Sequence, residues 1–321
     1  MTAYLDQHAD TIPVPFIRTL VENSIRTEYG VEPEDSSALQ LIFNLPTVQE
    51  DHVEVVGASD ETFVVEGGSG QLIQALAQAL AGQIQTRMAL QRLEAVGSGF
   101  RLGFATRQVV DADMVILAIP FTVLREVEIQ VALPQRLRRF IQEVDLGANE
   151  KVIAGFAERV WRQADGFVKE AWTDLGFSAV WDATQRQPTR EDGALTFFVG
   201  GREVEAVQAG SAQEQLEQIL PQFARFIPGA EDAATGQVVR THWTQNRWTR
   251  GGYTSFQPGQ LTQFGDWLWV ESEDPAERQE VHVGNLVFAG EHVSDEFYGF
   301  MNGGAQTGRL AAEALLRRLS S

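Results

Sequence analysis

Two lysines are the residues of this chain best suited to tunable charge chemistry. The sequence has 321 residues and 25 lysines and arginines, of which only Lys151 and Lys169 are lysines. A lysine carries a compact ammonium group whose charge responds to burial, whereas an arginine keeps its charge and offers a planar fork of donors. Each lysine is therefore a candidate functional residue, with base composition as the alternative explanation for their scarcity.

A glycine-rich run near the C-terminus is the second candidate site. The apolar stretch 286–289 predicts a buried strand that ends in Gly290 and Glu291, and a helix is expected from about Gly303. Glycines let the backbone approach a ligand closely, and a helix start offers free N–H groups and the positive end of the helix dipole. The run predicts a site that stabilises negative charge on a bound ring or phosphate, with a plain helix–strand packing contact as the alternative.

Composition excludes or disfavours several other chemistries. The chain has no cysteine, which rules out disulfides, thiolate nucleophiles and cysteine-linked cofactors. The five histidines lack metal-ligand spacing, so no metal site is predicted. Residues 97–103 resemble a dinucleotide fingerprint, but a strand follows them where a fingerprint opens a helix, so they predict a hairpin turn. The sequence has no other G-x-G-x-x-G pattern and no phosphate-binding loop.

The charge balance argues against a nucleic-acid partner. With 44 acidic and 25 basic residues the net charge is −19, and such a surface repels phosphate. The chain has no apolar run of the roughly 18 residues that a membrane span needs, and it does not open with a charged and then apolar leader. We therefore expect no nucleic-acid partner, no membrane partner and a cytoplasmic location.

The pattern of apolar residues predicts the elements that position these candidates. The run 114–120 is continuously apolar, which is typical of a strand buried on both faces. Further strands are expected over 89–95, 100–105, 151–156, 195–200 and 286–289. Helices are expected within 1–48 (one of them over 36–45), after Gly70, over 212–226 with a break at Pro221, and over 303–319 with a buried stripe of Ala305, Ala312, Leu315, Leu316 and Leu319. Tryptophans are concentrated between 161 and 248.

These elements predict an α/β protein of two interleaved domains. Two α/β segments, 62–130 and about 250–321, flank a mixed segment of strands and helices, while the first 60 residues are helical. At roughly 150 residues per domain, the length suggests two domains. Because two α/β segments flank a segment of different character, we expect two interleaved domains rather than two consecutive ones.

Five segments resemble, in order and at similar spacing, the signatures of the flavin-containing amine oxidase family. They are the glycine turn 67–71, the strand 112–120, the stretch 144–151, the stretch 248–259 and the C-terminal run 286–312. The resemblance covers residues 62–319. It implies an FAD-binding, partly Rossmann-like domain (62–140 and 246–321) interleaved with a substrate domain that has a helical part (1–61) and a mixed sheet with helices (141–245).

The resemblance implies a flavoenzyme that oxidises a small-molecule amine to an imine, with dioxygen as acceptor and hydrogen peroxide as product. Lys151 matches the family lysine that holds a water against flavin N5, a role suited to an ammonium rather than a guanidinium. Tyr253 and Phe300 match the aromatic pair that flanks the amine, where some members have two tyrosines. Lys169 matches no family position.

The resemblance also implies which residues contact FAD. Gly252 stands where some members carry the cysteine that links to the flavin, so FAD would be bound non-covalently. The implied contact positions are Gly67, Gly68, Leu90, Gly290, Glu291, Gly299, Phe300 and Met301.

One part of the family pattern is missing. The family begins with a β-α-β unit that carries G-x-G-x-x-G, and this sequence does not contain one. We expect a truncation, with a separate G-x-G-x-x-G-bearing partner chain or a non-catalytic remnant as alternatives. A related flavoprotein desaturase or protoporphyrinogen-type oxidase is the other functional alternative, although Lys151 together with Tyr253 favours amine oxidation.

Overall fold

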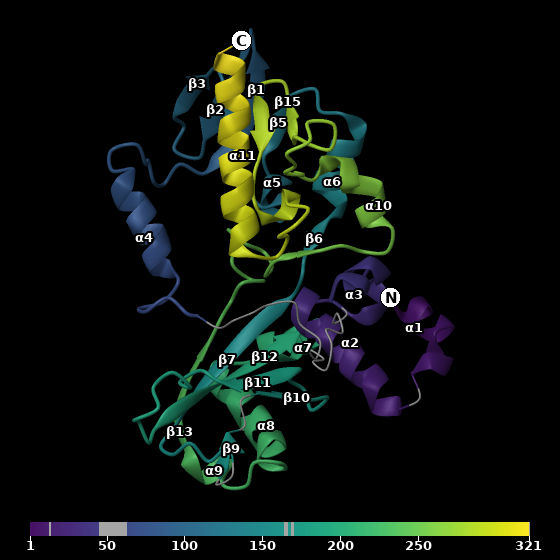
Figure 1. Ribbon diagram of the computed structural model, residues 1–321. Coiled ribbons are helices and arrows are strands. Elements are labelled where there is room, and N and C mark those ends of the chain that lie inside the picture. Colours follow the sequence, from purple (N-terminus) through teal and green to yellow (C-terminus); the bar gives the residue numbers. More distant parts are fainter. Residues whose placement is uncertain (13, 45–62, 164–165, 168–169, 321) are drawn as a thin grey trace.

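The computed structural model describes residues 1–12, 14–44, 63–163, 166–167 and 170–320. Figure 1 shows an upper lobe, a lower lobe and a group of N-terminal helices beside the lower lobe. The α/β fold expected from the sequence is confirmed. Lys169 lies outside the described residues.

The upper lobe is built from two stretches that are distant in the sequence (Figure 1). Its four-stranded sheet has the order β3-β2-β1-β5, and its three-stranded sheet has the order β15-β16-β4 with β16 parallel to β4. One hydrophobic cluster, drawn from residues between 93 and 144 and between 256 and 314, fills this lobe. Its elements are β1 (Leu90–Val96), β2 (Gly99–Phe104), β3 (Val109–Ala112), β4 (Val115–Leu117), α5 (Phe121–Leu124), β5 (Glu128–Gln130), α6 (Gln135–Glu143), β6 (Asp145–Leu146), β14 (Thr254–Ser255), α10 (Gln260–Phe264), β15 (His282–Val283), β16 (Leu286–Phe288) and α11 (Met301–Leu319), with 3₁₀ turns at Gly265–Trp267 and Glu291–Val293.

The lower lobe is a five-stranded antiparallel sheet with helices on one face. The strand order is β10-β11-β12-β7-β13, and β7 leads into it from the upper lobe (Figure 1). Its apolar cluster includes Val152, Ala154 and Phe156 of β7, which alternate along the strand as a half-buried strand requires. Its elements are β7 (Asn149–Phe156), β8 (Arg162–Gln163), β9 (Gly166–Phe167), β10 (Glu170–Trp172), β11 (Ala179–Asp182), β12 (Gly193–Gly200), α7 (Glu203–Gln208), α8 (Ala212–Ala224), α9 (Ala230–Ala233) and β13 (Ala234–Arg240).

The N-terminal helices form a third, smaller core. They are α1 (Thr2–Gln7), α2 (Pro15–Tyr29) and α3 (Ala38–Asn44), with 3₁₀ turns at Ala9–Thr11 and Pro33–Asp35. Proline occupies the first turn of α2, where its missing N–H is not needed, and Gly30 ends the helix in the left-handed conformation. The short helix expected over 36–45 is confirmed as α3.

Several predicted elements are confirmed and three details are wrong. The hairpin at 97–99 is confirmed, because β1 and β2 pair antiparallel with Val96 opposite Gly99. The helix over 212–226 does not break at Pro221, since α8 continues past this exposed proline and Phe223 anchors its last turn against the core. The strand expected over 114–120 is shorter and is open on one face, where Ile116 is 39% exposed.

The buried stripe predicted for the C-terminal helix is also wrong. The residues of α11 that are buried are Gly303, Thr307, Leu310, Ala311 and Ala314. Leu316 and Leu319 are exposed, as are Ala305 and Ala312, and Leu315 is half-buried. The helix approaches its neighbours closely at Gly303, where an added Cβ would lie 2.3 Å from the Phe297 carbonyl oxygen. The face of α11 that packs against the upper lobe is therefore made mostly of small residues.

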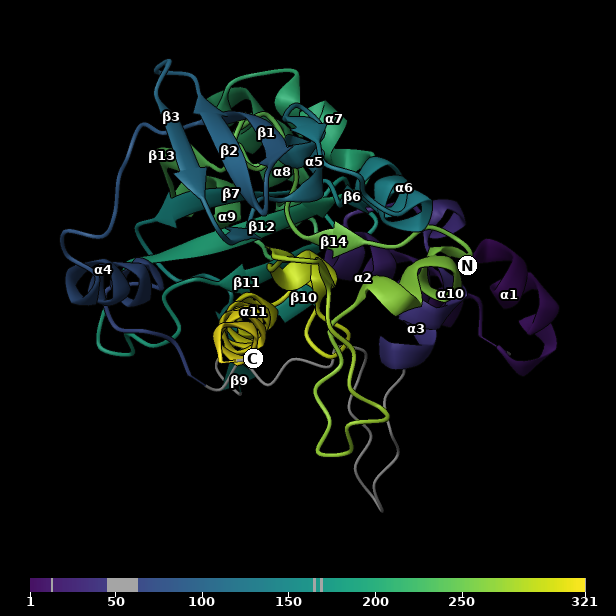
Figure 2. The same cartoon turned by 90° about the horizontal axis from the view of Figure 1, so that it is seen from above.

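Helix α4 (Gly70–Ala79) stands apart from both lobes in Figures 1 and 2. The helix forms where the sequence predicts it, but none of its residues is buried. Leu72, Ile73 and Leu76 are each about half exposed or more. No helix among the described residues has the length and apolarity to cross a membrane.

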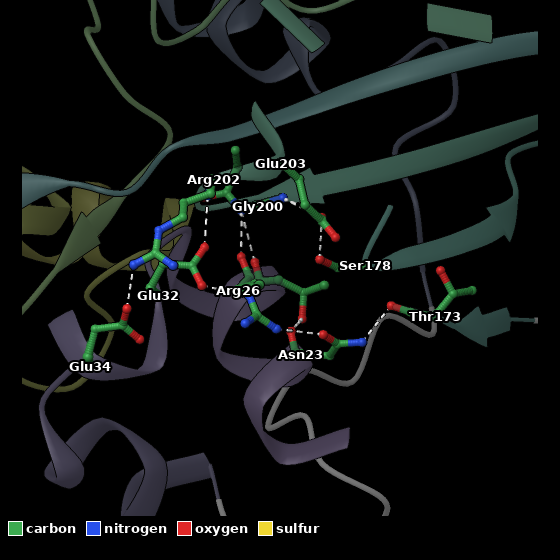
Figure 3. A network of polar contacts seen from close by, with 11 residues as sticks. Asn23, Arg26, Glu32, Glu34, Thr173, Ser178, Gly200, Arg202 and Glu203 are labelled. Carbon is green, nitrogen blue, oxygen red and sulfur yellow. Dashed lines mark hydrogen bonds and ion pairs between the residues drawn. The ribbon is translucent and has the colours of Figure 1, made fainter. Parts of the chain in front are cut away.

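A network of polar groups, several of them buried, joins the end of α2 to the lower sheet (Figure 3). The Arg26 guanidinium pairs with the Glu32 carboxylate at 2.9 Å, and the backbone N–H of Arg202 donates to the other oxygen of Glu32 at 2.9 Å. The amide of Asn23 donates to the Thr173 carbonyl. Glu203 accepts from the Ser178 hydroxyl and from the Gly200 N–H, while burial raises the pKa of its carboxyl. These bonds fix α2 against the end of β12.

Candidate functional site

Lys151 lies on β7, on the face of the lower sheet opposite the lobe's apolar core. Its neighbours in the strand, Glu150 and Val152, are buried, whereas Lys151 is half-buried. Phe198 of β12 lies directly across from it. The Lys151 backbone N–H donates to the Thr241 hydroxyl at 2.8 Å, which fixes the strand beside the segment that follows β13.

Glu150 holds that following segment in place from inside the protein. Its side chain is almost completely buried. One carboxylate oxygen accepts from the Thr241 hydroxyl at 2.5 Å, and the other accepts from the Thr244 N–H at 3.1 Å and its hydroxyl at 2.8 Å. Because buried carboxylates are stable only when their oxygens are hydrogen-bonded, this cluster fixes the path of residues 241–244, and Trp243 with them.

Tyr253 is oriented by the end of α2. Its hydroxyl donates to the Thr27 carbonyl at 2.6 Å, one of the last-turn carbonyls that a helix cannot satisfy internally. The Asn149 amide donates to the same carbonyl at 3.0 Å. Burial and the charge of Glu28 raise the pKa of Tyr253. The hydroxyl therefore stays protonated and keeps its hydrogen bond to α2.

Glu291 ties the Tyr253 segment to the Phe300 segment. One carboxylate oxygen accepts from the Thr254 hydroxyl at 2.8 Å and from its N–H at 3.2 Å, and the other accepts from the Gly299 N–H at 2.6 Å. Burial raises the pKa of Glu291, and these hydrogen bonds oppose the rise. Thr254 follows Tyr253 and Gly299 precedes Phe300. A single carboxylate therefore links the backbone next to one member of the predicted aromatic pair to the backbone next to the other.

Gly290 and the start of α11 lie next to this clamp. Gly290 has φ 134°, and both its N–H and its carbonyl are bonded to the Thr307 hydroxyl of α11, at 2.9 and 3.1 Å. Phe300 is the N-cap residue of α11, and no side chain caps the helix. Phe300 and Met301 are 45% and 58% exposed. The N–H groups at the start of this 19-residue helix, which no side chain caps, therefore lie beside the end of β16.

The other predicted contact positions are not gathered at this place. Gly67 and Gly68 form an exposed turn with positive φ angles before α4, which stands apart. Leu90 is half-buried at the start of β1, against the upper core. The structure therefore brings together Gly290, Glu291, Tyr253 and the 299–301 segment, and leaves Gly67 and Gly68 outside.

Sequence reasoning missed the residues that support the site. It assigned no role to Glu150, Asn149 or Trp243, and it placed Glu291 only near the cofactor. The concentration of tryptophans between 161 and 248 was a signal, but the sequence does not indicate which of these rings face Lys151.

His292 makes the stability of the folded protein depend on pH. The ring is fully buried against Phe121, with centroids 4.4 Å apart, and burial lowers the pKa of His292 to about 4. An unfolded histidine titrates near 6.5, so the unfolded state binds more protons between these values. We expect the free energy of unfolding to fall by about 3 kcal/mol as the pH drops from about 6.5 to about 4.

The control for this prediction is His292→Phe, which keeps a ring beside Phe121 and removes the titration. Urea unfolding of both proteins across the pH range isolates the histidine, because the buried carboxyls of Glu203 and Glu291, whose raised pKa values act in the opposite direction, are common to both. Parallel stability curves for the two proteins would show that the prediction is wrong.

Comparison with known proteins identifies the family. Residues 23–316 match the family described as flavin containing amine oxidoreductase, and the chain belongs to that family. Among curated relatives it is 24% identical to the dog protein "Amine oxidase [flavin-containing] B" and 24% identical to the bovine "Amine oxidase [flavin-containing] A", in each case over 82% of this chain and 48% of the relative. The chain thus spans about half the length of the curated relatives it matches.

Solved structures show a similar fold. Cyclohexylamine oxidase from Brevibacterium oxydans superposes with a TM-score of 0.78 at 24% identity, over 98% of this chain and 67% of that one. Putrescine oxidase bound to putrescine superposes with a TM-score of 0.71 at 25% identity, over 92% of this chain and 64% of that one. The resemblance inferred from the five segments is confirmed, and a flavin is the cofactor that the family implies.

The residues at the α11 site fit a flavin. The uncapped N–H groups at the helix start suit an electron-rich ring or a phosphate. An added Cβ at Gly304 or Gly308 of α11 would meet nothing within 4 Å, so no side chain prevents an approach to the helix. β16 runs parallel to β4, and Gly290 lies just beyond its carboxyl end, where open α/β sheets bind their ligands.

Proposed function

We propose that this chain supplies the substrate side and part of the FAD site of an amine oxidase that converts a small-molecule amine to an imine, with dioxygen as acceptor and peroxide as product. The observation that carries the proposal is the Glu291 carboxylate, which joins the Tyr253 and Phe300 segments at the uncapped start of α11. Bound FAD supplies the capacity to accept a hydride equivalent from the carbon next to the amine nitrogen.

The chain's own residues orient the amine and control its charge. The rings of Tyr253 and Phe300 exclude water from the amine and so favour its neutral form, which is the form that can be oxidised. Because the Tyr253 hydroxyl is bonded to Thr27, its ring is held in one orientation. Lys151 keeps an ordered water at the reacting edge of the flavin. With Gly252 beside Tyr253 and no cysteine in the chain, FAD is held non-covalently.

We also propose that the working enzyme includes a β-α-β unit with G-x-G-x-x-G that packs on the open side of the upper lobe. Three features support this unit. In the described part of the chain β4 is the outer strand of its sheet, Ile116 of β4 is partly exposed, and the apolar side chains of α4 cover nothing. The free outer edge of a parallel strand and the exposed apolar face of a helix are both surfaces that soluble proteins normally cover.

Co-expression tests the function. The chain is produced together with a β-α-β unit taken from the N-terminus of a longer family member. We expect a co-purifying complex with visible flavin absorbance and amine-dependent peroxide release. Ile116→Asp should abolish assembly, whereas Val239→Asp, at an exposed site on the lower sheet, should not. A complex without flavin would refute the proposal, and flavin without amine-dependent peroxide would favour a desaturase or a protoporphyrinogen-type oxidase.

A further inference from the structure

Three aromatic rings surround the ammonium group of Lys151. The Nζ atom lies 5.4 Å from the ring centroid of Trp181, 5.6 Å from that of Phe198 and 5.7 Å from that of Trp243. All three distances are within the roughly 6 Å at which a cation is attracted to the face of an aromatic ring. The rings come from β11, from β12 and from the segment after β13, so the arrangement depends on the folded sheet.

The register of the sheet explains two of the rings. Phe198 pairs directly with Lys151 across the β12–β7 ladder, so both side chains rise from the same face. Trp181 pairs with Thr196, which lies two residues before Phe198 and therefore on the same face. The rings of Trp181 and Phe198 also contact each other, with centroids 5.5 Å apart at 60°. Each ring limits the movement of the other.

The third ring is fixed by hydrogen bonds on either side of it. Thr241 and Thr244 are bonded to the buried carboxylate of Glu150, and Trp243 lies between them. The Trp243 carbonyl also accepts from the Gly251 N–H and the Thr249 hydroxyl. Hydrogen bonds of the neighbouring threonines and of the Trp243 backbone therefore place this ring.

We infer that Trp181, Phe198 and Trp243 are positioning residues that form an aromatic cage around the Lys151 ammonium, holding it charged and in one place before cofactor or substrate binds. The cage itself requires only the described side chains, and its use in catalysis rests on the proposed function. It differs from ordinary apolar packing in one respect, because the π faces stabilise the cation and aliphatic side chains of similar size do not.

The scarcity of lysine makes the cage directly measurable. In protein labelled with ¹³Cε-lysine, only Lys151 and Lys169 give signals, and Lys169→Arg assigns them. We expect the ε protons of Lys151 to be shifted upfield by the three rings. Trp181→Leu and Trp243→Leu should each reduce that shift and change the ratio of ammonium to amine at alkaline pH roughly two- to fivefold toward the amine.

Conservative changes separate the π effect from packing. Trp181→Phe and Trp243→Phe keep an aromatic face and should retain most of the ammonium population. Fluorinated tryptophan, which keeps the shape of the ring and weakens its π face, should move the ratio in the same direction as leucine without disturbing the fold. Phe198→Leu adds a third measurement, and failure of that one variant to fold leaves the tryptophan series decisive.

The inference is overturned if the leucine variants and the fluorinated protein keep the wild-type ratio, or if the ε protons of Lys151 resonate where those of an exposed lysine do. These measurements need neither flavin nor amine. An intact cage in a protein that never oxidises amines would refute the proposed function alone, and an active enzyme with an uncaged lysine would refute the cage alone.

Discussion

Replacing Lys151 with methionine in the flavin-loaded complex is expected to slow the reaction of the reduced enzyme with dioxygen by roughly a hundredfold, the lower range for loss of a positioned proton-handling group. Methionine has a similar length and apolar stem, so the change removes the ammonium and its hydrogen-bonded water with little change in volume. The measurement is stopped-flow mixing of anaerobically reduced enzyme with oxygenated buffer.

Two controls bear on this prediction. Lys151→Arg keeps the positive charge but replaces a compact donor with a planar fork among the three rings, so we expect an intermediate rate. Lys169→Arg should react at the wild-type rate, because the sequence assigns Lys169 no role. An unchanged rate in Lys151→Met would contradict the role proposed for this lysine, whatever its effect on amine binding.

Local sequence patterns predicted the elements whose signal lies within a few consecutive residues. The hairpin at Gly97 followed from a glycine turn between two alternating stretches, and β16 followed from a short apolar run that ends in Gly290. The length of α11 was nearly correct, although Gly303 and Gly304, expected at its start, lie within its first turn. In each case the residues that determine the element are adjacent in the sequence.

Burial was predicted less well, because it depends on neighbours that the pattern does not contain. The stripe expected on α11 followed its leucines, but the buried residues of this helix include Gly303, Thr307 and Ala311, and at Gly303 the helix lies too close to its neighbours for any side chain. Ile116 and the apolar face of α4 are exposed, although their residue types suggested burial. Hydrophobicity indicates which residues favour burial, whereas packing determines which of them are covered.

The candidate site depends both on residues that the sequence could predict and on contacts that only the fold creates. Lys151, Tyr253, Phe300 and Glu291 were predicted because they occur in segments with a family resemblance. The cage around Lys151 and the clamps made by Glu150 and Glu291 join residues that are many positions apart, such as Thr254 and Gly299. No periodicity encodes such contacts, since they arise only when strands and loops from different parts of the chain meet.

Gly200→Ala is expected to lower the free energy of unfolding by about 3 kcal/mol or more, at the upper end of the range for overpacked sites. Gly200 ends β12, and a Cβ added there would lie 1.8 Å from the Arg26 carbonyl oxygen of α2. Arg26 belongs to the network in Figure 3, and its carbonyl oxygen is a backbone atom, so it cannot rotate away from the added Cβ as a side chain could. Urea unfolding measures the effect.

Gly103→Ala on β2 is the matched control, because an added Cβ there would first meet the Arg92 Cβ at 3.6 Å, an ordinary contact. Neither glycine has a positive φ, so backbone strain contributes to neither change. Alanine at 103 should be neutral or stabilising by up to about 1 kcal/mol, through the lower entropy of the unfolded chain. Equal stability of the two variants would contradict the close approach of α2 to β12.

The consequence of Gly200→Ala for the site follows from the route of α2. If the helix moves away from β12, the Thr27 carbonyl moves with it and the Tyr253 hydroxyl loses its acceptor. Gly147→Ala should push on the same helix end, since its Cβ would lie 1.9 Å from the Tyr29 carbonyl oxygen. One displacement of α2 relieves both clashes, so the double variant should be less destabilised than the sum of the single changes. Full additivity would show that the two glycines act on independent parts of the interface.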